Sequence, residues 1–437
     1  MALGAVLMGT GNHLAGWRHP LARADGSHDI AFFQHLARTA EAACFDMVFL
    51  ADSVGIRERG GPDTLARSHH IAQLEPLTLL SALAVSTERI GLVATASTTY
   101  NEPYHVARKF ASLDHISRGR AGWNAVTSFT DSEAVNFNRD KHLAHDLRYA
   151  RARSFVDIVC GLWDSWDDDA FVRDKASGIH VDTAKMHYLQ HRSEHFGVRG
   201  PLNVARPPQG HPVLVQAGAS EDGQRLAAET AEVVFCAADT LDQARSFRTA
   251  LQQRTAEAGR DPALLRVMPG IYVVTAPTEA EAQEKQQALL ELVHPAIGLA
   301  QLSSMIGFDL SPYPLDGPLP DIVGTQGHQS RQRLLVEQAR REGWSIRRLY
   351  QQVSSAFGHK VLVGSAAQVA DELAHWFEAG AADGFNIMAP YLPGGLEDFC
   401  RLVVPRLQRS GLLRSRYEGT TLREHLGLPR PRSRYAA

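Results

Sequence analysis

Short apolar runs alternate with longer amphipathic stretches along almost the whole chain. Eight short runs have the length and β-branched composition of buried strands, at residues 3–8, 46–50, 90–94, 120–127, 212–217, 232–237, 265–274 and 384–389. Eight longer stretches have helical spacing, at residues 29–44, 76–86, 103–116, 143–162, 221–231, 241–257, 278–298 and 366–379. This alternation predicts an α/β fold, a closed (β/α)₈ barrel of the TIM type rather than an open doubly wound sheet.

Two of the predicted helices also carry start signals. Pro76 suits the first turn of a helix, where the missing backbone N–H costs nothing. Ser365 and Gln368 have the spacing of a capping box, in which each side chain bonds the backbone of the other residue.

Three segments exceed the minimal βα repeat, at residues 51–75, 164–211 and 302–345. The last is dense in glycine and proline, and a long irregular segment in a compact domain is typical of a functional cover. We therefore expect residues 302–345 to form a lid. No linker divides the chain, so residues 1–428 are expected to form one domain and the Pro- and Arg-rich residues 429–437 a loose tail.

The composition excludes several classes of protein. Hydrophobic residues make up 44% of the 437 residues and charged residues 21%, which suits a large core and is too apolar for a disordered chain. The net charge of -3 offers no footprint for nucleic acid or for anionic lipid. No apolar stretch approaches the roughly 20 residues that a membrane span needs.

The cysteines and the N-terminus bear on the compartment. The four cysteines lie far apart without a C-x-x-C pair, which predicts neither a disulfide framework nor a thiolate metal site: Cys44, Cys160, Cys236 and Cys400. Residues 3–8 lack the basic segment of a signal peptide and run directly into Gly9. We therefore expect a soluble protein of the reducing cytoplasm.

The active sites of such barrels lie on the loops that follow the strands. The polar candidates there are Asn12, His13, Asp52, Ser53, residues 95–100, Asn124, Thr127, Ser128 and residues 218–220. The turn Gly218-Ala219-Ser220 lies between a strand and a helix, where backbone N–H groups and the helix dipole favour a phosphate. The sequence thus indicates a phosphate-bearing ligand at this turn.

Plainer interpretations stand beside these candidates. Gly9-Thr10-Gly11 follows a strand, but Leu14 takes the place of the third glycine of a nicotinamide fingerprint. His13 fits an ordinary loop histidine, and Asp52 fits a turn cap. The histidine groups at 69–70 and 187–195 lack metal-ligand spacing, and no G-x-S-x-G elbow or P-loop occurs.

Several motifs, in the same order along the chain, resemble one family. They are FDMVFLADS at 45–53, TASTTYNEPYHVAR at 95–108, SRGRAGWNAVTS at 117–128, GLWDSWDD at 161–168, GPLNVARPPQGHPVLVQAGAS at 200–220 and AGAADGFNIMAPYLPGG at 379–395. They resemble the bacterial-luciferase-like flavin monooxygenases, and within these the branch of the nitrilotriacetate, EDTA and dibenzothiophene-sulfone monooxygenases. The resemblance runs from the first strand to the last helix.

The resemblance implies an FMNH₂-dependent monooxygenase, the oxygenase component of a two-component system. A separate NAD(P)H:FMN reductase would supply reduced FMN, which with O₂ would give a C4a-(hydro)peroxyflavin that oxygenates a small organic substrate. It also implies the contacting residues. The flavin would lie near Asp52, Asn124, Ser128 and Tyr149, its phosphate on Gly218, Ala219 and Ser220, and the catalytic candidates are His13, Tyr100 and His105.

Two details and two alternatives qualify this interpretation. Relatives often have two hydroxyl residues at the phosphate turn, whereas this chain has Ala219 before Ser220. The long-chain alkane enzyme has a cysteine near the histidine that His13 matches, and Met8 to Asn12 supply none, which argues against an alkane substrate. The alternatives are a deazaflavin-dependent oxidoreductase of the same superfamily and a non-catalytic flavin-binding barrel. We also expect a homo-oligomer, a dimer or tetramer, and no bound metal.

Overall fold

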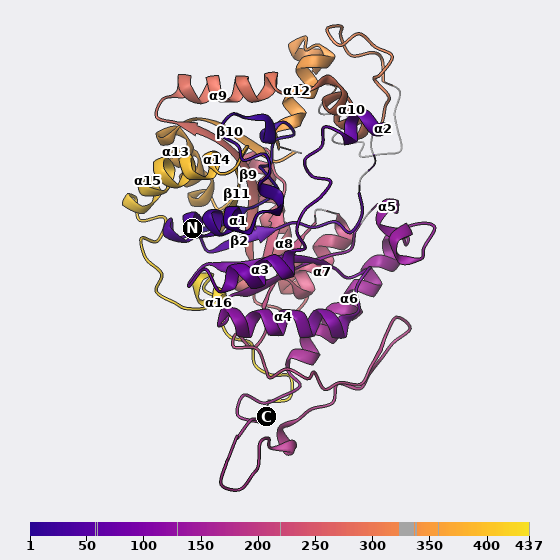
Figure 1. Ribbon diagram of the computed structural model, residues 1–437, viewed down its shortest axis with the longest axis vertical. Helices are drawn as coiled ribbons and strands as arrows, with labels where there is room; N and C mark the ends of the chain where they lie inside the picture. The colour runs from indigo at the N-terminus through magenta and orange to yellow at the C-terminus, as the bar shows by residue number, and fades with distance from the viewer. Residues whose placement is uncertain are drawn as a thin grey trace.

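Eight parallel strands close into a barrel in the computed structural model, which describes residues 1–436 except 57, 59, 129, 219, 323–335, 337, 338 and 357. In barrel order the strands are β1 (Ala2–Val6), β2 (Met47–Leu50), β3 (Gly91–Ser97), β4 (Ala121–Val126), β7 (Val213–Ala217), β8 (Val233–Cys236), β9 (Arg266–Ala276) and β11 (Gly384–Met388). β11 pairs with β1 and closes the ring. The predicted barrel is confirmed, with each strand where the sequence placed it (Figure 1).

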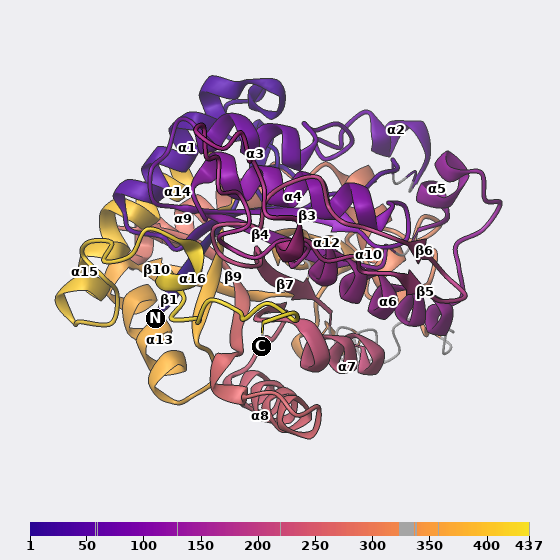
Figure 2. The ribbon, with the colours of Figure 1, turned by 90° about the horizontal axis from the view of Figure 1, so that it is seen from below.

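Helices surround the strands, as Figure 2 shows. They are α1 (Ile30–Ala42), α3 (Pro76–Ala84), α4 (Pro103–Ser117), α6 (His145–Trp163), α7 (Glu221–Thr230), α8 (Leu241–Glu257), α9 (Glu279–Glu291) and α13 (Ala366–Glu378). Pro76 lies in the first turn of α3, and Ser365 and Gln368 form the expected capping box on α13. The buried core therefore has two parts, the apolar layer between strands and helices and the filled lumen of the barrel.

The expected helix at 278–298 is wrong as a single element. The chain breaks after α9, and a second helix, α10 (Pro295–Ile306), leaves at 92°. Pro295 causes the break because proline disfavours helical backbone at the residue before it, and His294 is extended at ψ 135°. No single helix in the described ranges is long and apolar enough to cross a membrane, and only the bent pair α9–α10 passes on length and composition.

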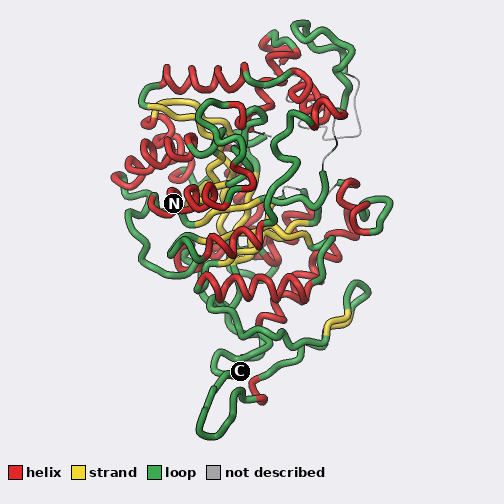
Figure 3. The backbone as a smooth tube through the Cα atoms, viewed as in Figure 1, coloured by secondary structure: helices red, strands yellow, loops and turns green. Residues whose placement is uncertain are grey.

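Several elements were not predicted. β10 (Lys360–Ser365) follows α12 (Ile346–Ala356). It pairs with the C-terminal half of β9, which extends beyond the barrel wall. The other unpredicted elements are short: α2 (Gly61–Leu65), α5 (Asp131–Ala134), β5 (His191–Arg192), β6 (Gly197–Val198), α14 (Gly394–Asp398), α15 (Val404–Arg409) and α16 (Leu422–His425), with a π-helical turn at Phe399–Val403 and 3-10 turns at Gly16–Arg18, Gly26–His28, Val135–Phe137, Thr183–Lys185 and Pro262–Leu264. Figure 3 shows how much of the chain outside the barrel is loop.

Each end of the lumen is closed by side chains from distant segments. At the amino ends of the strands, Leu422 of α16 fills the space beside Gly91, where a Cβ would lie 2.4 Å from the leucine side chain. At the carboxyl ends, Phe49 of β2 and Phe235 of β8 meet edge to face across the lumen with ring centroids 5.3 Å apart. The lumen is a packed core, and a ligand must bind above Phe49 and Phe235.

A helical layer lies over one side of the molecule, where Figure 1 shows α2, α10 and α12 grouped. α10 and α12 share a separate apolar core that includes Leu14 and Ala15, next to the first strand. The expected lid at 302–345 begins inside α10, because residues 302–306 continue that helix. Residues 323–335, 337 and 338 of that segment lie outside the described residues.

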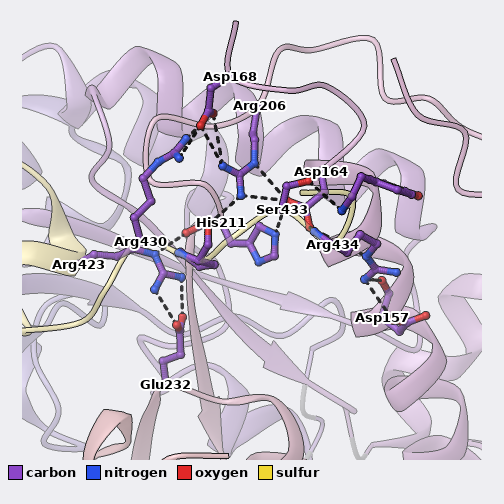
Figure 4. A network of polar contacts seen from close by, with 12 residues as sticks. Asp157, Asp164, Asp168, Arg206, His211, Glu232, Arg423, Arg430, Ser433 and Arg434 are labelled. Carbon is purple, nitrogen blue, oxygen red and sulfur yellow. Dashed lines mark hydrogen bonds and ion pairs between the residues drawn. The ribbon is translucent and has the colours of Figure 1, made fainter. Parts of the chain in front are cut away.

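The C-terminal segment is not the loose tail that its composition predicted. The guanidinium of Arg430 donates to Asp168 at 2.7 Å, and the backbone N–H of Arg434 donates to Asp164 at 3.1 Å. The ring of Tyr435 stacks on His187 with centroids 4.4 Å apart. Figure 4 shows the contacts of Arg430 with Asp168 and of Arg434 with Asp164, which join the last residues to the 164–211 insertion. The Pro- and Arg-rich composition predicted a loose tail, but acidic partners 262 or more residues away in sequence bind its arginines.

Asp164 is the buried centre of this network. Its side chain is 2% exposed and accepts from Arg206 at 3.1 Å and from His211 at 3.0 Å. Burial alone would raise the pKa of Asp164, but the hydrogen bonds from His211 and the Arg434 amide, with the charge of Arg206, hold the pKa below its usual value. Asp168 also pairs with Arg206, yet its side chain is 55% exposed.

We predict that Asp164→Ala lowers the free energy of unfolding by roughly 3–5 kcal/mol, because it removes the buried acidic partner of the buried Arg206 and leaves only the exposed Asp168. Asp168→Ala is the matched control and should cost at most about 1 kcal/mol, since solvent screens an exposed pair. Urea unfolding followed by circular dichroism measures both. Equal losses for the two variants would show that burial of Asp164 is not what matters.

Candidate functional site

A cavity of about 770 Å³ opens above the carboxyl ends of the barrel strands. Its floor is apolar and consists of Val6, Phe49, Phe235 and Met388, which are strand residues. The walls come from the first insertion, the loop after β1 and α10, and include Asn12, Leu14, residues 51–56, 64–65, 68, 70–73 and 75, Asn136, Ile297, Ala300, Gln301 and His359. The volume lies in the range of roughly 300–1,000 Å³ that is typical of small-molecule and cofactor sites.

Asp52 lines this cavity, as the sequence suggested for a residue after the second strand. Burial raises the pKa of Asp52 above its usual value, and a hydrogen bond from the Gln73 amide, 3.2 Å away, acts in the opposite direction. Asp52 is therefore a hydrogen-bonding group on the cavity wall, held in place by Gln73. Gln73 was not predicted, because nothing in its local sequence marks it.

Asn124 and Ser128 lie at the end of β4, beside the loop after β3. Asn124 is 3% exposed, its Nδ2 donates to Thr95 at 2.8 Å, and its Oδ1 has no partner among the described residues. The Ser128 hydroxyl lies 2.8 Å from that of Ser97 and 3.1 Å from a carboxylate oxygen of Glu133. These buried polar groups are the kind that bind the polar part of a ligand.

The predicted phosphate turn has the expected helix start. Ser220 caps the N-terminus of α7, where its Oγ accepts from the backbone N–H of Gly223 at 3.1 Å. The Tyr149 hydroxyl comes from α6 and lies 3.2 Å from the same Oγ, so the structure brings these two predicted residues together. Gly218 ends the strand side of the turn, where a Cβ would lie 4.0 Å from the Tyr149 hydroxyl, and Ala219 lies outside the described residues.

His13 is buried and does not line the cavity, although Asn12 and Leu14 on either side of it do. Its Nδ1 accepts from the backbone N–H of Ala15 at 3.1 Å, which places the ring proton on Nε2. Burial, and to a smaller extent the nearby His19, lower the pKa of His13 to about 3. His13 is thus a neutral group at neutral pH, and its place among the catalytic candidates stays a prediction.

The other two catalytic candidates do not line the cavity either. Tyr100 bonds His142 through its hydroxyl and stacks on Phe137, with ring centroids 4.8 Å apart. His105 is exposed on α4. Both belong to the motif at residues 95–108. Helix α4 directs His105 to the surface, so residues that are close in this motif do not lie together in the site.

Two histidines of the first insertion reach the loop after β1. The ring of His69 lies 3.1 Å from both the Thr10 hydroxyl and the His13 carbonyl, and His70 lies 3.1 Å from the Gly11 carbonyl. They attach the insertion to the loop that carries Asn12. Among the described residues, no group of three or more His, Cys, Asp or Glu side chains could hold a metal.

Comparison with known proteins supplies the family. The family model described as luciferase-like monooxygenase matches residues 10–383. The chain is 53% identical to the N-acetyl-S-(2-succino)cysteine monooxygenase of Bacillus subtilis (strain 168), with 99% of this chain and 98% of that protein covered. It is 50% identical to component A of the nitrilotriacetate monooxygenase of Aminobacter aminovorans, with 100% and 98% covered.

Superposition on solved structures supports the same family. DmoA from Hyphomicrobium sulfonivorans superposes with a TM-score of 0.90 at 33% identity, covering 98% of this chain and 92% of that chain. A riboflavin lyase, crystallised with modified FMN and riboflavin, superposes at 0.86 with 32% identity and 98% and 96% covered. An F420-dependent secondary alcohol dehydrogenase, at 15% identity and 0.58, with 92% and 97% covered, shares the fold alone. The chain belongs to the luciferase-like monooxygenase family and is a flavin-dependent monooxygenase.

Proposed function

We propose that this chain is the oxygenase component of a two-component FMNH₂-dependent monooxygenase, acting on a small organic substrate. The observation that carries the proposal is the pairing of Tyr149 with Ser220 at the start of α7, on the same end of the barrel as the cavity. A helix N-terminus with hydroxyl groups favours a phosphate monoester such as that of FMN. The G-x-G after β1 lacks the third glycine of a nicotinamide site.

The residues present fit a flavin. The buried Oδ1 atoms of Asn12 and Asn124 have no partner in the described part of the chain, and both are acceptors for N–H or O–H donors. A reduced flavin offers more N–H donors than an oxidised one, and its ribityl chain adds hydroxyls. Bound reduced FMN would supply the two electrons that reduce O₂, with one oxygen atom going to the substrate and the other to water.

The chain's own residues would bind, orient and exclude water. Ser220 and Tyr149 would hold the phosphate, Asn124 and Ser128 the polar chain, and Asp52 the ring edge that reaches the cavity. Phe49 and Phe235 close the floor, and α10 contributes Ile297 and Ala300 to the wall. An apolar, covered pocket keeps bulk water from the reacting centre. The described part of the expected lid, which includes residues 302–322 and 339–345, would belong to this cover, because its apolar residues pack in the core that α10 and α12 share.

A separate reductase partner follows from the same proposal. The relative from Aminobacter aminovorans is named component A, which implies a second component in that system. Because the G-x-G after the first strand lacks the third glycine of a nicotinamide fingerprint, this chain would receive reduced FMN from an NAD(P)H:FMN reductase. A deazaflavin cofactor would make the chain active without O₂, and a non-catalytic barrel would bind flavin without forming product.

The first prediction tests this function. The purified chain should bind reduced FMN more tightly than oxidised FMN, measured anaerobically, and should oxidise almost no NADH alone. With a generic flavin reductase, FMN and NADH, a substrate panel that begins with nitrilotriacetate and N-acetyl-S-(2-succino)cysteine should show O₂-dependent product, with catalase present to remove peroxide. Stoichiometric NADH oxidation by the chain alone, or product without O₂, would contradict the proposal.

The second prediction concerns the phosphate. Ser220→Ala should weaken reduced-FMN binding roughly 10- to 150-fold and riboflavin binding hardly at all, because a hydrogen bond to a charged group is worth roughly 1.5–3 kcal/mol and riboflavin has no phosphate. Ser365→Ala is the matched control, since Ser365 caps α13 in the same way. It should lower stability by about 1 kcal/mol without affecting either ligand. Equal loss of FMN and riboflavin would place the phosphate elsewhere.

The third prediction revises the role of His13. We propose that His13 positions the loop of Asn12 as a neutral group. Its pKa is lower in the folded chain than its usual 6.5, so the unfolded chain binds a proton that the folded chain does not, and stability falls as the pH drops below 6.5 towards 3. His13→Gln should therefore reduce the pH slope of the unfolding free energy by about 1.4 kcal/mol per pH unit between pH 6 and 4.5, in urea titrations. An unchanged slope would show that His13 is protonated in the fold.

A further inference from the structure

Glu133 joins three segments at the edge of the site. It is 3% exposed, in α5. Its Oε2 accepts from the backbone N–H of Thr130 at 3.2 Å and from the Thr130 hydroxyl at 2.8 Å, which completes a capping box. Its Oε1 lies 3.3 Å from the hydroxyl of Ser53, a cavity residue after β2, and 3.1 Å from that of Ser128, after β4. One carboxylate oxygen therefore caps the helix and the other faces the site.

The carboxylate sets the direction of the neighbouring hydroxyl groups. An ionised carboxylate only accepts hydrogen bonds, so Ser128 must donate its single proton to Glu133. Ser97, 2.8 Å from Ser128, must then donate to the Ser128 oxygen, and Ser97 itself accepts from the backbone N–H of Thr99 at 3.1 Å. The chain runs from Ser97 through Ser128 to Glu133. Ser128 has one lone pair left and can only accept from a ligand.

The backbone holds Ser128 in this orientation. Its φ of 55° lies in the left-handed region, which a serine adopts at a cost and keeps only where its surroundings enforce it. The guanidinium of Arg148, from α6, donates to the Ser128 carbonyl. Ser128 is therefore fixed both in backbone conformation and in the direction of its hydroxyl.

A second acceptor lies on the same strand end. The Oδ1 of Asn124 is buried and has no partner among the described residues, while its Nδ2 is used by Thr95. The Ser128 oxygen keeps one lone pair after accepting from Ser97, and the Asn124 Oδ1 accepts from none of the described residues. Two such acceptors, one in β4 and one just after it, favour a ligand segment that carries several O–H donors, which is the chemistry of a polyol chain.

We propose that Glu133 is a positioning residue that fixes Ser128 as a hydrogen-bond acceptor for the ribityl hydroxyls of the flavin. This inference rests on the proposed function, because the ribityl chain belongs to FMN. Glu133 then has two roles. Its Oε2 accepts the capping bonds from Thr130, and its Oε1 accepts from Ser128. The sequence marks Glu133 only as a capping residue, three positions after Thr130.

Glu133→Gln separates the two tasks. Capping boxes accept glutamine, so the amide oxygen can keep the bonds from Thr130, and the amide N–H₂ then faces Ser53 and Ser128. The amide N–H₂ and Ser97 then both donate to the Ser128 oxygen, so both of its lone pairs are used, and Ser128 has only its proton to offer a ligand group that is itself a donor. The matched control is Glu281→Gln, because Glu281 forms the same capping box with Thr278 on the exposed start of α9, away from the cavity.

The experiment measures binding of FMN, riboflavin and lumiflavin by fluorescence titration of the full chain. Lumiflavin lacks the ribityl chain. Glu133→Gln should weaken FMN and riboflavin roughly 3- to 10-fold, the size of one hydrogen bond, and leave lumiflavin unchanged. Glu281→Gln should leave all three ligands unchanged. A loss that is the same for lumiflavin and riboflavin, or no loss, overturns the role of Glu133.

A second variant guards against a folding defect. Ser128→Ala removes the acceptor and leaves the capping box intact, and it should show the same loss for ribityl flavins only. In the Ser128→Ala background, Glu133→Gln should add no further loss, since the two act through one hydroxyl. Additive losses overturn the inference. Wild-type chain that binds neither reduced nor oxidised flavin overturns the proposed function itself, which the wild-type titration reveals before any variant is compared.

Discussion

The pairing of β1 with β11 is the contact on which the rest of the structure depends. It joins strands from the two ends of the chain, Ala2 opposite Gly384 and Ala5 opposite Ile387. The seam is tight, because a Cβ on Gly4 would lie 2.3 Å from Oδ1 of Asn386 and one on Gly384 would lie 2.2 Å from the Ala2 carbonyl. Closure at this seam gathers the loops after β1, β2, β4 and β7 around one rim. Without it, Asn12, Asp52, Ser128 and Ser220 would be spread along one edge of an open sheet.

The two ends of the barrel have different roles. At the amino ends of the strands, Leu422 plugs the lumen and Arg423 pairs with Glu232 at 2.6 Å, while Asp164 anchors the C-terminal segment. The ion pairs at this end are buried, so removing one partner destabilises the fold strongly, because it leaves an unpaired buried charge. At the carboxyl ends, apolar rings form a floor and buried acceptors remain for a ligand. Stability and ligand binding are therefore separated by the length of the barrel.

The polar groups at the carboxyl end share one property, which is that their direction is set by neighbours. Gln73 orients Asp52, Thr95 takes the amide of Asn124, and Glu133 takes the proton of Ser128. The backbone N–H of Ala15 holds His13 in one neutral tautomer. A site built in this way needs no reorganisation when a polar ligand arrives, and fixed dipoles in a buried pocket act more strongly than the same groups in water.

Local sequence determined the periodic part of this protein. Buried parallel strands are continuous apolar runs, and helices have a period near 3.6, so the barrel strands and the helix starts at Pro76 and Ser365 were predictable. Motif resemblance supplied the family and placed Asp52, Asn124, Ser128, Tyr149 and Ser220 near one rim. Tertiary structure decided the contacts between segments that lie far apart in the sequence. Pro295 broke a helix, β10 formed because β9 is long enough to pair beyond the wall, and acidic partners bound the tail. His13 turned out buried and neutral and Glu133 faced the site, because burial and hydrogen-bond direction depend on which segments the closed barrel brings together.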